Sequence, residues 1–269
     1  MIKLDNDIIS IEVLPEKGGI ISSLRYLGSE ILYCNIENIL SSERPKCGIP
    51  ILFPCCGRTN ENKVIFDRKE YKMPIHGFAH LLSWKVVEKK LHNIITLKLS
   101  SSEETKKYYP YDFVAHISYE LTENSLKIKF TVKNTGNNSM PFALGYHPYF
   151  KMEKMEDVAV FIDGCDFIDY NTGAKICYAQ PITFNGDNEI TYIYERPNVP
   201  IVIQNKKLGK KIIMKSDEYF SNIILWKGES SKFVCVEPWG AMPNALNNRE
   251  CRYLLSEESF ESFISFEIA

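Results

Sequence analysis

The sequence predicts an all-β fold, a large sandwich of antiparallel sheets. The first observation behind this prediction is that apolar and polar residues alternate along most of the chain. A strand with one buried face and one wet face has this period of two, and such strands pair in antiparallel sheets. The second is that convincing amphipathic helices are scarce. The third is that turn-forming segments such as NTGNN and FNGDN recur between the alternating runs.

The alternating runs are expected to form strands whose apolar side chains face the core. In chain order, their apolar positions are Ile9, Ile11 and Val13, then Ile95, Leu97 and Leu99, then Leu126, Ile128, Phe130 and Val132, and finally Ile264, Phe266 and Ile268. The short run EESFESF before the last strand does not decide between helix and strand.

A hairpin is expected between the third and the last of these runs. The segments VPIVIQN and KKIIMKS are each typical of a strand, and KKLGKK lies between them as a turn. We interpret the basic stretch Lys206–Lys211 as a solvated hairpin turn, with a phosphate-binding role as the alternative.

Length and charge restrict the class of protein. The chain has 269 residues, of which 45% are hydrophobic, so it can bury a sizeable core. No linker rich in Pro, Gly or Ser divides it, and we expect one domain over residues 1–269. The formal charge is −2, so the chain lacks the basic field that attracts nucleic acid.

The sequence indicates a cytoplasmic protein with reduced cysteines. The N-terminal segment carries Asp5, Asp7 and Glu12 and lacks the apolar core of a signal peptide, and no apolar run approaches the length that spans a bilayer. In that compartment cysteines act as small hydrophobes. None of them shows C-x-x-C spacing, so we expect no cysteine zinc site. The eight cysteines are Cys34, Cys47, Cys55, Cys56, Cys165, Cys177, Cys235 and Cys251.

Four short stretches carry side chains that can do chemistry. GIPILFPCCGRTNE contains Arg58, MPIHGFAH contains His76 and His80, ALGYHPYF contains His147, and FVCVEPWGAMPN contains Glu237. Each also has a structural interpretation, because a histidine beside a glycine or a proline is often a hydrogen-bonded turn residue, and a glutamate at a strand end is often solvated.

Strand geometry favours a functional role for the glutamate. In KFVCVEPW, Val234 and Val236 share one face, and Cys235 and Glu237 share the other. We expect Pro238 to end the ladder of hydrogen bonds directly after Glu237. Sheet ends and the loops that they hold are good places for sites.

Taken together and in this order, the four stretches resemble the aldose 1-epimerase (galactose mutarotase-like) family, and within it the LacX-like bacterial branch. The resemblance runs from about Ile2 to Ile268 and includes the YYPYDF and FTVKNTG segments. It implies a large antiparallel sandwich with a sugar cleft on a concave face, and interconversion of the α and β anomers of an aldose. That reaction needs no metal, nucleotide or redox cofactor, and we expect none.

The resemblance also implies roles for individual residues. Glu237 matches the catalytic base, His147 the general acid and His76 the second histidine at the sugar. Arg58 matches an arginine that contacts sugar hydroxyls. The backbone of His147 is expected to be extended, because a residue before proline avoids the helical region.

Other positions depart from the family pattern or match it loosely. Cys55–Cys56 stands where an aromatic residue is frequent, and His80 stands where relatives that accept sugar phosphates have an arginine. Asp187 is the nearest candidate for a sugar-binding aspartate. Trp239 is a candidate to stack on a pyranose, with packing as the alternative. Asn244 replaces the usual aspartate after the EPW motif.

The expected function is therefore an aldose 1-epimerase, or mutarotase, acting on an aldohexose, with a monosaccharide as its partner and with neither nucleic acid nor membrane. The alternatives are a hexose-6-phosphate mutarotase and a non-catalytic carbohydrate-binding or regulatory protein with the same cleft. A metal hydrolase is disfavoured because H-E-x-x-H is absent. A two-carboxylate glycosidase is disfavoured because only one carboxylate lies in a recognisable motif. Monomer and homodimer remain equally open.

Overall fold

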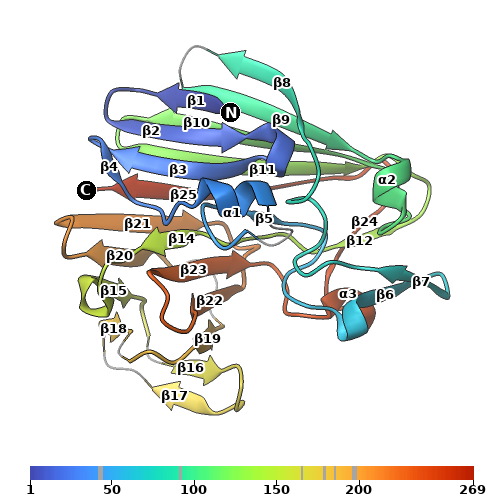
Figure 1. Ribbon diagram of the computed structural model, residues 1–269. Helices are drawn as coiled ribbons and strands as arrows, with labels where there is room; N and C mark the ends of the chain where they lie inside the picture. Colours follow the sequence, from blue (N-terminus) through green and yellow to red (C-terminus); the bar gives the residue numbers. More distant parts are fainter. Residues whose placement is uncertain (42–44, 91–92, 165, 178–179, 185, 196–198) are drawn as a thin grey trace.

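Strands dominate the structure (Figure 1), a computed structural model that describes residues 1–269 except 42–44, 91–92, 165, 178–179, 185 and 196–198. The α-helices among the described residues are short: α1 (Ile36–Ser41), α2 (Glu103–Lys106) and α3 (Ala245–Asn248). Single 3₁₀ turns occur at Pro15–Lys17, Asn60–Asn62 and Met155–Asp157. The predicted all-β class is confirmed.

The strands fall into five antiparallel sheets in the described part of the chain. The first sheet contains β1 (Ile2–Asp5), β2 (Ile9–Leu14), β3 (Ile20–Tyr26) and β4 (Ser29–Glu30). The second contains, in spatial order, β18 (Ile182–Thr183), β15 (Val158–Phe161), β20 (Ile201–Asn205), β21 (Lys210–Ser216), β25 (Ser259–Ile268), β11 (Ser125–Asn134), β10 (Phe113–Thr122), β9 (Ile94–Ser100) and β8 (Lys85–Lys90). The third contains β17 (Lys175–Cys177), β16 (Asp166–Asp169), β19 (Ile190–Tyr194), β22 (Asn222–Lys227), β23 (Phe233–Trp239), β13 (Gly145–Tyr146) and β5 (Ile51–Leu52), with β14 (Tyr149–Lys151) also paired to β23. Two small ribbons pair β12 (Met140–Phe142) with β24 (Arg252–Leu254) and β6 (Lys63–Phe66) with β7 (Lys69–Lys72).

In the large second sheet, the apolar residues of the alternating runs lie on one buried face. In β11, Leu126, Ile128 and Phe130 are buried while the residues between them are not. Most of the segment EESFESF belongs to β25, which begins at Ser259, although Ser262 takes a buried position and Phe263 lies on the other face. The predicted hairpin is also present, since β20 and β21 pair through a turn that starts at Lys206.

Layers of sheet enclose one extended apolar core. The N-terminal sheet lies against the nine-stranded sheet in Figure 1, and Leu97 and Ile117 share a core cluster with Ile11. The hydroxyl of Tyr119 on β10 donates a hydrogen bond of 2.5 Å to the Gly19 carbonyl, which joins the two sheets. Apolar residues of β22 and β23 belong to the same cluster, so the eight-stranded sheet closes the sandwich.

The eight-stranded sheet differs from the others because both faces of its central strands are buried. Val234 and Val236 face the main core, and Cys235 and Trp239 belong to a second cluster on the opposite face. The prediction that Pro238 ends the ladder is wrong. Strand β23 continues to Trp239, because losing one N–H does not prevent the flanking residues from pairing with β22.

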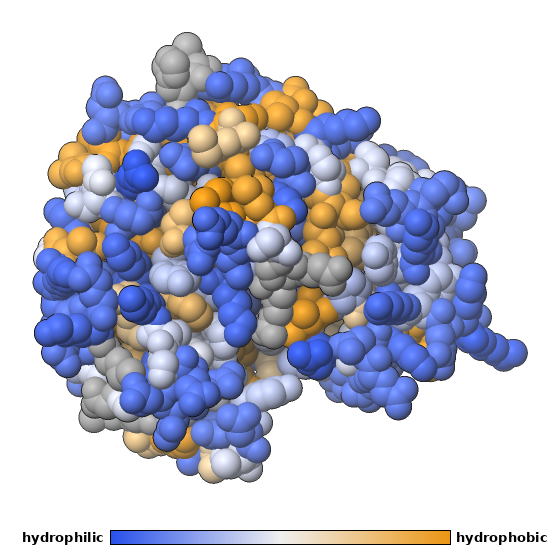
Figure 2. Space-filling model, in the orientation of Figure 1, coloured by the Kyte–Doolittle hydropathy of each residue, from blue (hydrophilic) through white to orange (hydrophobic). Residues whose placement is uncertain are grey.

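The surface shown in Figure 2 is mostly hydrophilic. Hydrophilic residues cover most of the face shown in Figure 2, with separate apolar patches between them. No helix of the described residues combines the length and the apolar character needed to cross a bilayer. Of the described cysteines, Cys47, Cys55 and Cys56 are buried in the core, as expected for cysteines that act as hydrophobes, while Cys34 and Cys177 are exposed.

Candidate active site

A cleft of about 440 Å³ lies on the second face of the eight-stranded sheet. Strands β19, β22 and β23 supply its floor, and the loops at residues 57–58, 75–76 and 242–243 supply part of its wall. Its volume is within the range of small-ligand sites. His76, His147, Glu237, Arg58 and Trp239 all line it, so most of the residues singled out from the sequence meet in one place.

The register of β23 explains how His147 and Glu237 meet although 90 positions separate them. Gly145 on β13 lies opposite Trp239, and Tyr149 on β14 lies opposite Cys235. His147 connects β13 to β14 and therefore falls opposite Glu237, between these two pairs. Residues opposite each other in an antiparallel pair project from the same face. The result is a distance of 3.3 Å between His147 Nε2 and Glu237 Oε2.

Packing fixes the orientation of the His147 ring. The ring is stacked on Tyr149, with centroids 4.5 Å apart and planes 5° from parallel. The backbone N–H of His147 donates to the Pro50 carbonyl at 3.1 Å rather than to β23. Only 4% of the residue is exposed, so this histidine is both packed and directed at the cleft.

His76 is held by the backbone of Gly57, and this contact defines its tautomer. The N–H of Gly57 donates to His76 Nδ1 at 3.0 Å, while the N–H of His76 donates to the Gly57 carbonyl at 2.8 Å. A backbone N–H can only donate, so Nδ1 carries a lone pair and the neutral ring has its proton on Nε2. His76 is therefore a hydrogen-bond donor at Nε2.

The loop that holds His76 depends on two residues with left-handed backbones. His76 has φ of 65°, an uncommon value for a residue with a side chain. Gly57 has φ of 70°, and a Cβ placed there would come within 2.7 Å of Pro243. Strained backbone of this kind persists where the surrounding structure holds it, and it concentrates at functional sites.

Two tryptophans each hold a carboxylate at the cleft. Trp239 Nε1 donates to Glu237 Oε2 at 3.1 Å, and Trp226 Nε1 donates to Glu189 Oε1 at 2.7 Å. Glu237 is 1% exposed and lies on the floor, whereas Glu189 is exposed. Trp239 packs its ring against His76 at 5.7 Å between centroids. The tryptophan considered for sugar stacking thus also orients the buried carboxylate.

The rim of the cleft differs from the sequence expectation at one position. Arg58 lines the cleft and is exposed, with Nη1 3.3 Å from the Asn62 side chain. Asp187 is not among the described lining residues; its carbonyl accepts from the N–H of Ser230 at 3.0 Å. The carboxylate that lines the cleft from this segment is Glu189, two residues later.

The cleft also has polar lining residues that were not predicted. Tyr170 and Asn171 reach the cleft from the turn between β16 and β17. The residues 171–173 read NTG, which is typical of a turn, but nothing in that turn indicates that it contributes to the same cleft as β19 and β22.

The three departures from the family pattern have separate structural roles. His80 lies behind the cleft, where it lines a void of about 10 Å³ with His76 and His147. Cys55 and Cys56 are fully packed, and burial raises the pKa of Cys55 to about 12. Asn244 lies outside the described lining of the cleft and stabilises the wall instead.

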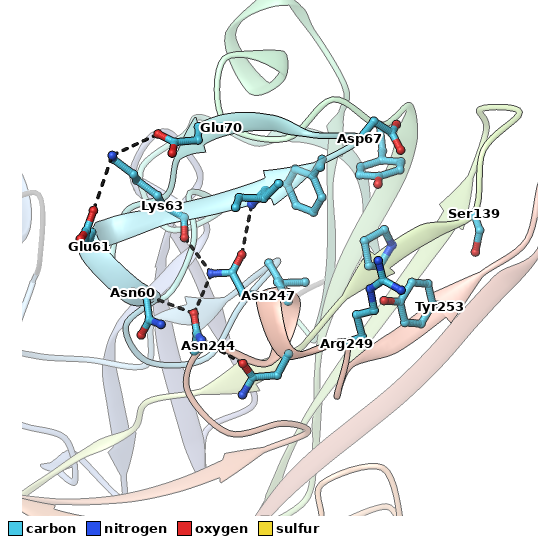
Figure 3. Close-up of a pocket in the computed structure, with 16 residues that line it drawn as sticks. Asn60, Glu61, Lys63, Asp67, Glu70, Ser139, Asn244, Asn247, Arg249 and Tyr253 are labelled. Atoms are coloured by element: carbon cyan, nitrogen blue, oxygen red, sulfur yellow. Dashed lines mark hydrogen bonds and ion pairs between the residues drawn. The ribbon is translucent and has the colours of Figure 1, made fainter.

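A larger hollow of about 910 Å³ lies on the other side of this wall, between the β6–β7 ribbon and α3. Figure 3 shows that its polar side chains bond to one another. Asn244 Oδ1 accepts from the Asn60 N–H at 3.0 Å and from Asn247 Nδ2 at 2.7 Å, and Lys63 pairs with Glu70 at 3.0 Å. Its described lining contains no histidine, so the smaller cleft is the better candidate for acid–base chemistry.

The arrangement on the cleft floor suits proton transfer. An imidazole and a carboxylate lie side by side at 3.3 Å, and not on opposite walls. Two such groups can reach two oxygens bonded to one carbon atom of a ligand above them. Both are shielded from bulk water, which strengthens their interaction with a bound ligand. The side chain of Cys235 lies close to the same pair.

Comparison with known proteins identifies a family that matches nearly the whole chain. The sequence matches the family model described as "Aldose 1-epimerase" over residues 1–266. A "Putative glucose-6-phosphate 1-epimerase" of Escherichia coli is 26% identical over 185 residues, which cover 66% of this chain and 57% of that protein. The matched segment thus spans little more than half the length of that curated relative.

Solved structures show the same fold. The Slr1438 protein from Synechocystis sp. PCC 6803 superimposes with a TM-score of 0.91 at 27% identity, covering 100% of this chain and 95% of that one. A galactose mutarotase-related enzyme from Lactobacillus acidophilus superimposes with a TM-score of 0.85 at 22% identity, covering 100% and 97%.

Proposed function

This chain belongs to the aldose 1-epimerase family, and we propose that it catalyses the interconversion of the α and β anomers of an aldohexose. The observation that supports the proposal most strongly is the contact of His147 Nε2 with Glu237 Oε2 on the floor of a cleft of monosaccharide size. The hydroxyl on C1 and the ring oxygen are both bonded to C1, so one sugar can present one oxygen to each group.

In the proposed reaction, the Glu237 carboxylate takes the proton of the C1 hydroxyl. The electron pair of that O–H bond forms the carbonyl at C1, and the bond from C1 to the ring oxygen breaks. His147 delivers a proton to the ring oxygen. Rotation about C1–C2 exposes the other face of the aldehyde, and the same steps in reverse close the ring. Each positioned acid or base contributes roughly 10²–10⁴-fold to such a reaction.

The remaining cleft residues hold the sugar in this account. His76 donates from Nε2, because its Nδ1 accepts the Gly57 N–H, and so it polarises a sugar oxygen. Arg58 offers a planar set of donors to hydroxyls at the rim. Glu189 accepts from a hydroxyl on that side while Trp226 fixes its position. The proposed steps transfer protons only and therefore call on no redox or nucleotide cofactor.

The test is polarimetry on a panel of freshly dissolved pure anomers, including glucose, galactose and their 6-phosphates. We expect the protein to speed the approach to rotational equilibrium for at least one sugar of the panel. If no sugar equilibrates faster than in buffer while calorimetry detects sugar binding, the non-catalytic carbohydrate-binding alternative replaces the proposal.

A hexose 6-phosphate is the second candidate substrate. The curated relative from E. coli has a name that refers to glucose 6-phosphate. In this chain, Arg58 lies on the cleft wall, and Lys46 Nζ lies 5.7 Å from the ring centroid of Trp226, another lining residue. This candidate predicts a higher kcat/KM for the 6-phosphate, which Lys46→Ala lowers without affecting the free sugar.

A further inference from the structure

Three unlike metal-binding side chains converge beneath the cleft. His147, Cys235 and Glu237 are all buried, and one ligand atom of each lies within 4.8 Å of the others. Nitrogen, sulfur and oxygen ligands of these types are the set that Zn²⁺ takes in proteins. We propose that Zn²⁺ binds to these three residues and inhibits the protein by occupying its proton-transfer pair.

The spacing is close to that of a tetrahedral site. With bonds of about 2.0–2.3 Å, two ligand atoms of a tetrahedral zinc lie about 3.3–3.8 Å apart. The nitrogen of His147 and the oxygen of Glu237 already lie 3.3 Å apart. The sulfur of Cys235 must approach by no more than about 1.3 Å, since no separation in the group exceeds 4.8 Å and sulfur lies about 3.5 Å from a nitrogen or oxygen ligand in such a site.

The backbone and the neighbouring side chains hold these ligands in place. Cys235 and Glu237 are two residues apart on β23 and so project from the same face. Trp239 donates to the Glu237 carboxylate, and Tyr149 is stacked on the His147 ring. Such partners of metal ligands orient them and strengthen metal binding. The side toward the cleft supplies the fourth coordination position.

His76 is not part of the proposed metal site although it is close. Its ring centroid lies 5.3 Å from that of His147, but its Nδ1 accepts from Gly57, which leaves the proton on Nε2. For Nε2 of neutral His76 to bind a metal, the ring proton would have to move to Nδ1, where it would face the Gly57 N–H. The residue that distinguishes this site from an ordinary acid–base pair is therefore Cys235.

Binding would also change protonation. The cation replaces the proton of the Cys235 thiol and the proton on His147 Nε2, so affinity should rise with pH. A cation held there occupies both groups that the mutarotase mechanism needs. The inhibition rests on the proposed function, whereas the binding of Zn²⁺ does not.

The experiment uses the full-length protein with three cysteines replaced by serine. They are the exposed Cys34 and Cys177, and Cys165. Calorimetry measures Zn²⁺ binding, and Co²⁺ serves as a spectroscopic probe because a thiolate ligand gives a charge-transfer band in the near ultraviolet. Cys235→Ser and Cys235→Ala test the sulfur ligand. Cys47→Ser is the matched control, because Cys47 is equally buried but lies in a separate apolar cluster.

We expect one Zn²⁺ per chain, a thiolate band with Co²⁺, and loss of that band in both Cys235 variants, with Zn²⁺ affinity lower by on the order of 100-fold or more. Cys47→Ser should retain both signals. Absence of the thiolate band from the parent protein, or unchanged Zn²⁺ affinity in the Cys235 variants, would overturn the inference.

Mutarotation assays on the same samples separate the two proposals. Zn²⁺ should inhibit the parent at the concentrations that fill the site, and the inhibition should weaken in Cys235→Ala by the same factor as the affinity. Accelerated mutarotation without Zn²⁺ binding would remove this inference alone. Zn²⁺ binding without mutarotation would remove the proposed function, and with it the inhibition, and would leave the metal site.

Discussion

The hydrogen bond from Trp239 to Glu237 offers the sharpest test of how this site is built. Trp239→Phe removes the Nε1–H that donates to Glu237 Oε2 at 3.1 Å. It keeps an aromatic ring next to His76 and in the cleft wall. The substitution therefore isolates the orientation of the carboxylate from the packing of the ring.

The expected magnitude follows from the burial of the carboxylate. Glu237 is 1% exposed, so water cannot readily replace the lost donor. A hydrogen bond to a charged group contributes about 1.5–3 kcal/mol. If most of that energy fixes the carboxylate in its reactive position, kcat falls about 10- to 100-fold, since about 1.4 kcal/mol corresponds to a factor of ten.

Steady-state mutarotation of a pure anomer, followed by polarimetry, measures this effect. We expect kcat to fall while KM changes by less than about threefold, because the lost interaction acts on the base and not on sugar binding. Trp226→Phe is the matched control: it frees Glu189 at the rim and should raise KM with kcat retained. A kcat within twofold of the parent (about 0.4 kcal/mol) for Trp239→Phe would refute this account of the hydrogen bond.

Three further predictions concern the base, the rim and the thiols. Glu237→Gln should lower kcat by roughly 10²–10⁴-fold with little loss of sugar affinity. Its control is Glu261→Gln, which changes a glutamate in an exposed pair with Lys129. Near-parental activity of Glu237→Gln would remove Glu237 from the mechanism. Arg58→Ala should raise KM about 3- to 10-fold at constant kcat, and a change confined to kcat would contradict a binding role. At neutral pH an alkylating reagent should modify exposed Cys177 but not Cys55, because burial raises the pKa of Cys55 to about 12. Mass spectrometry of the native protein measures which cysteines are modified. Modification of Cys55 without unfolding would contradict the prediction.

The sequence predicted the sandwich well because alternation is a local signal. Strands such as β9, β11 and β25 show it without reference to the rest of the chain. Local rules failed where pairing partners decide the outcome. Pro238 lacks an N–H and so predicts a strand end, yet β22 continues to pair with β23 on both sides of it.

The site was predicted from resemblance rather than from periodicity. No local pattern shows that β13 and β14 pair with β23 on either side of His147, and this pairing is what brings the imidazole to Glu237. The lack of a local signal also explains why the carboxylate at the rim of the cleft was not predicted. The segment around Asp187 was identified, but which of its residues faces the cleft depends on the packing of Trp226 against Glu189.

We propose that His147 and Glu237, side by side at 3.3 Å, open and close a sugar ring. Two-dimensional exchange NMR on an equilibrated aldohexose tests it directly, because anomers that interconvert during the mixing time give cross-peaks between their H1 signals. We expect cross-peaks with the wild-type protein and their loss with Glu237→Gln. Exchange no faster than in buffer for every sugar that binds, or undiminished exchange in the Glu237→Gln protein, would contradict it.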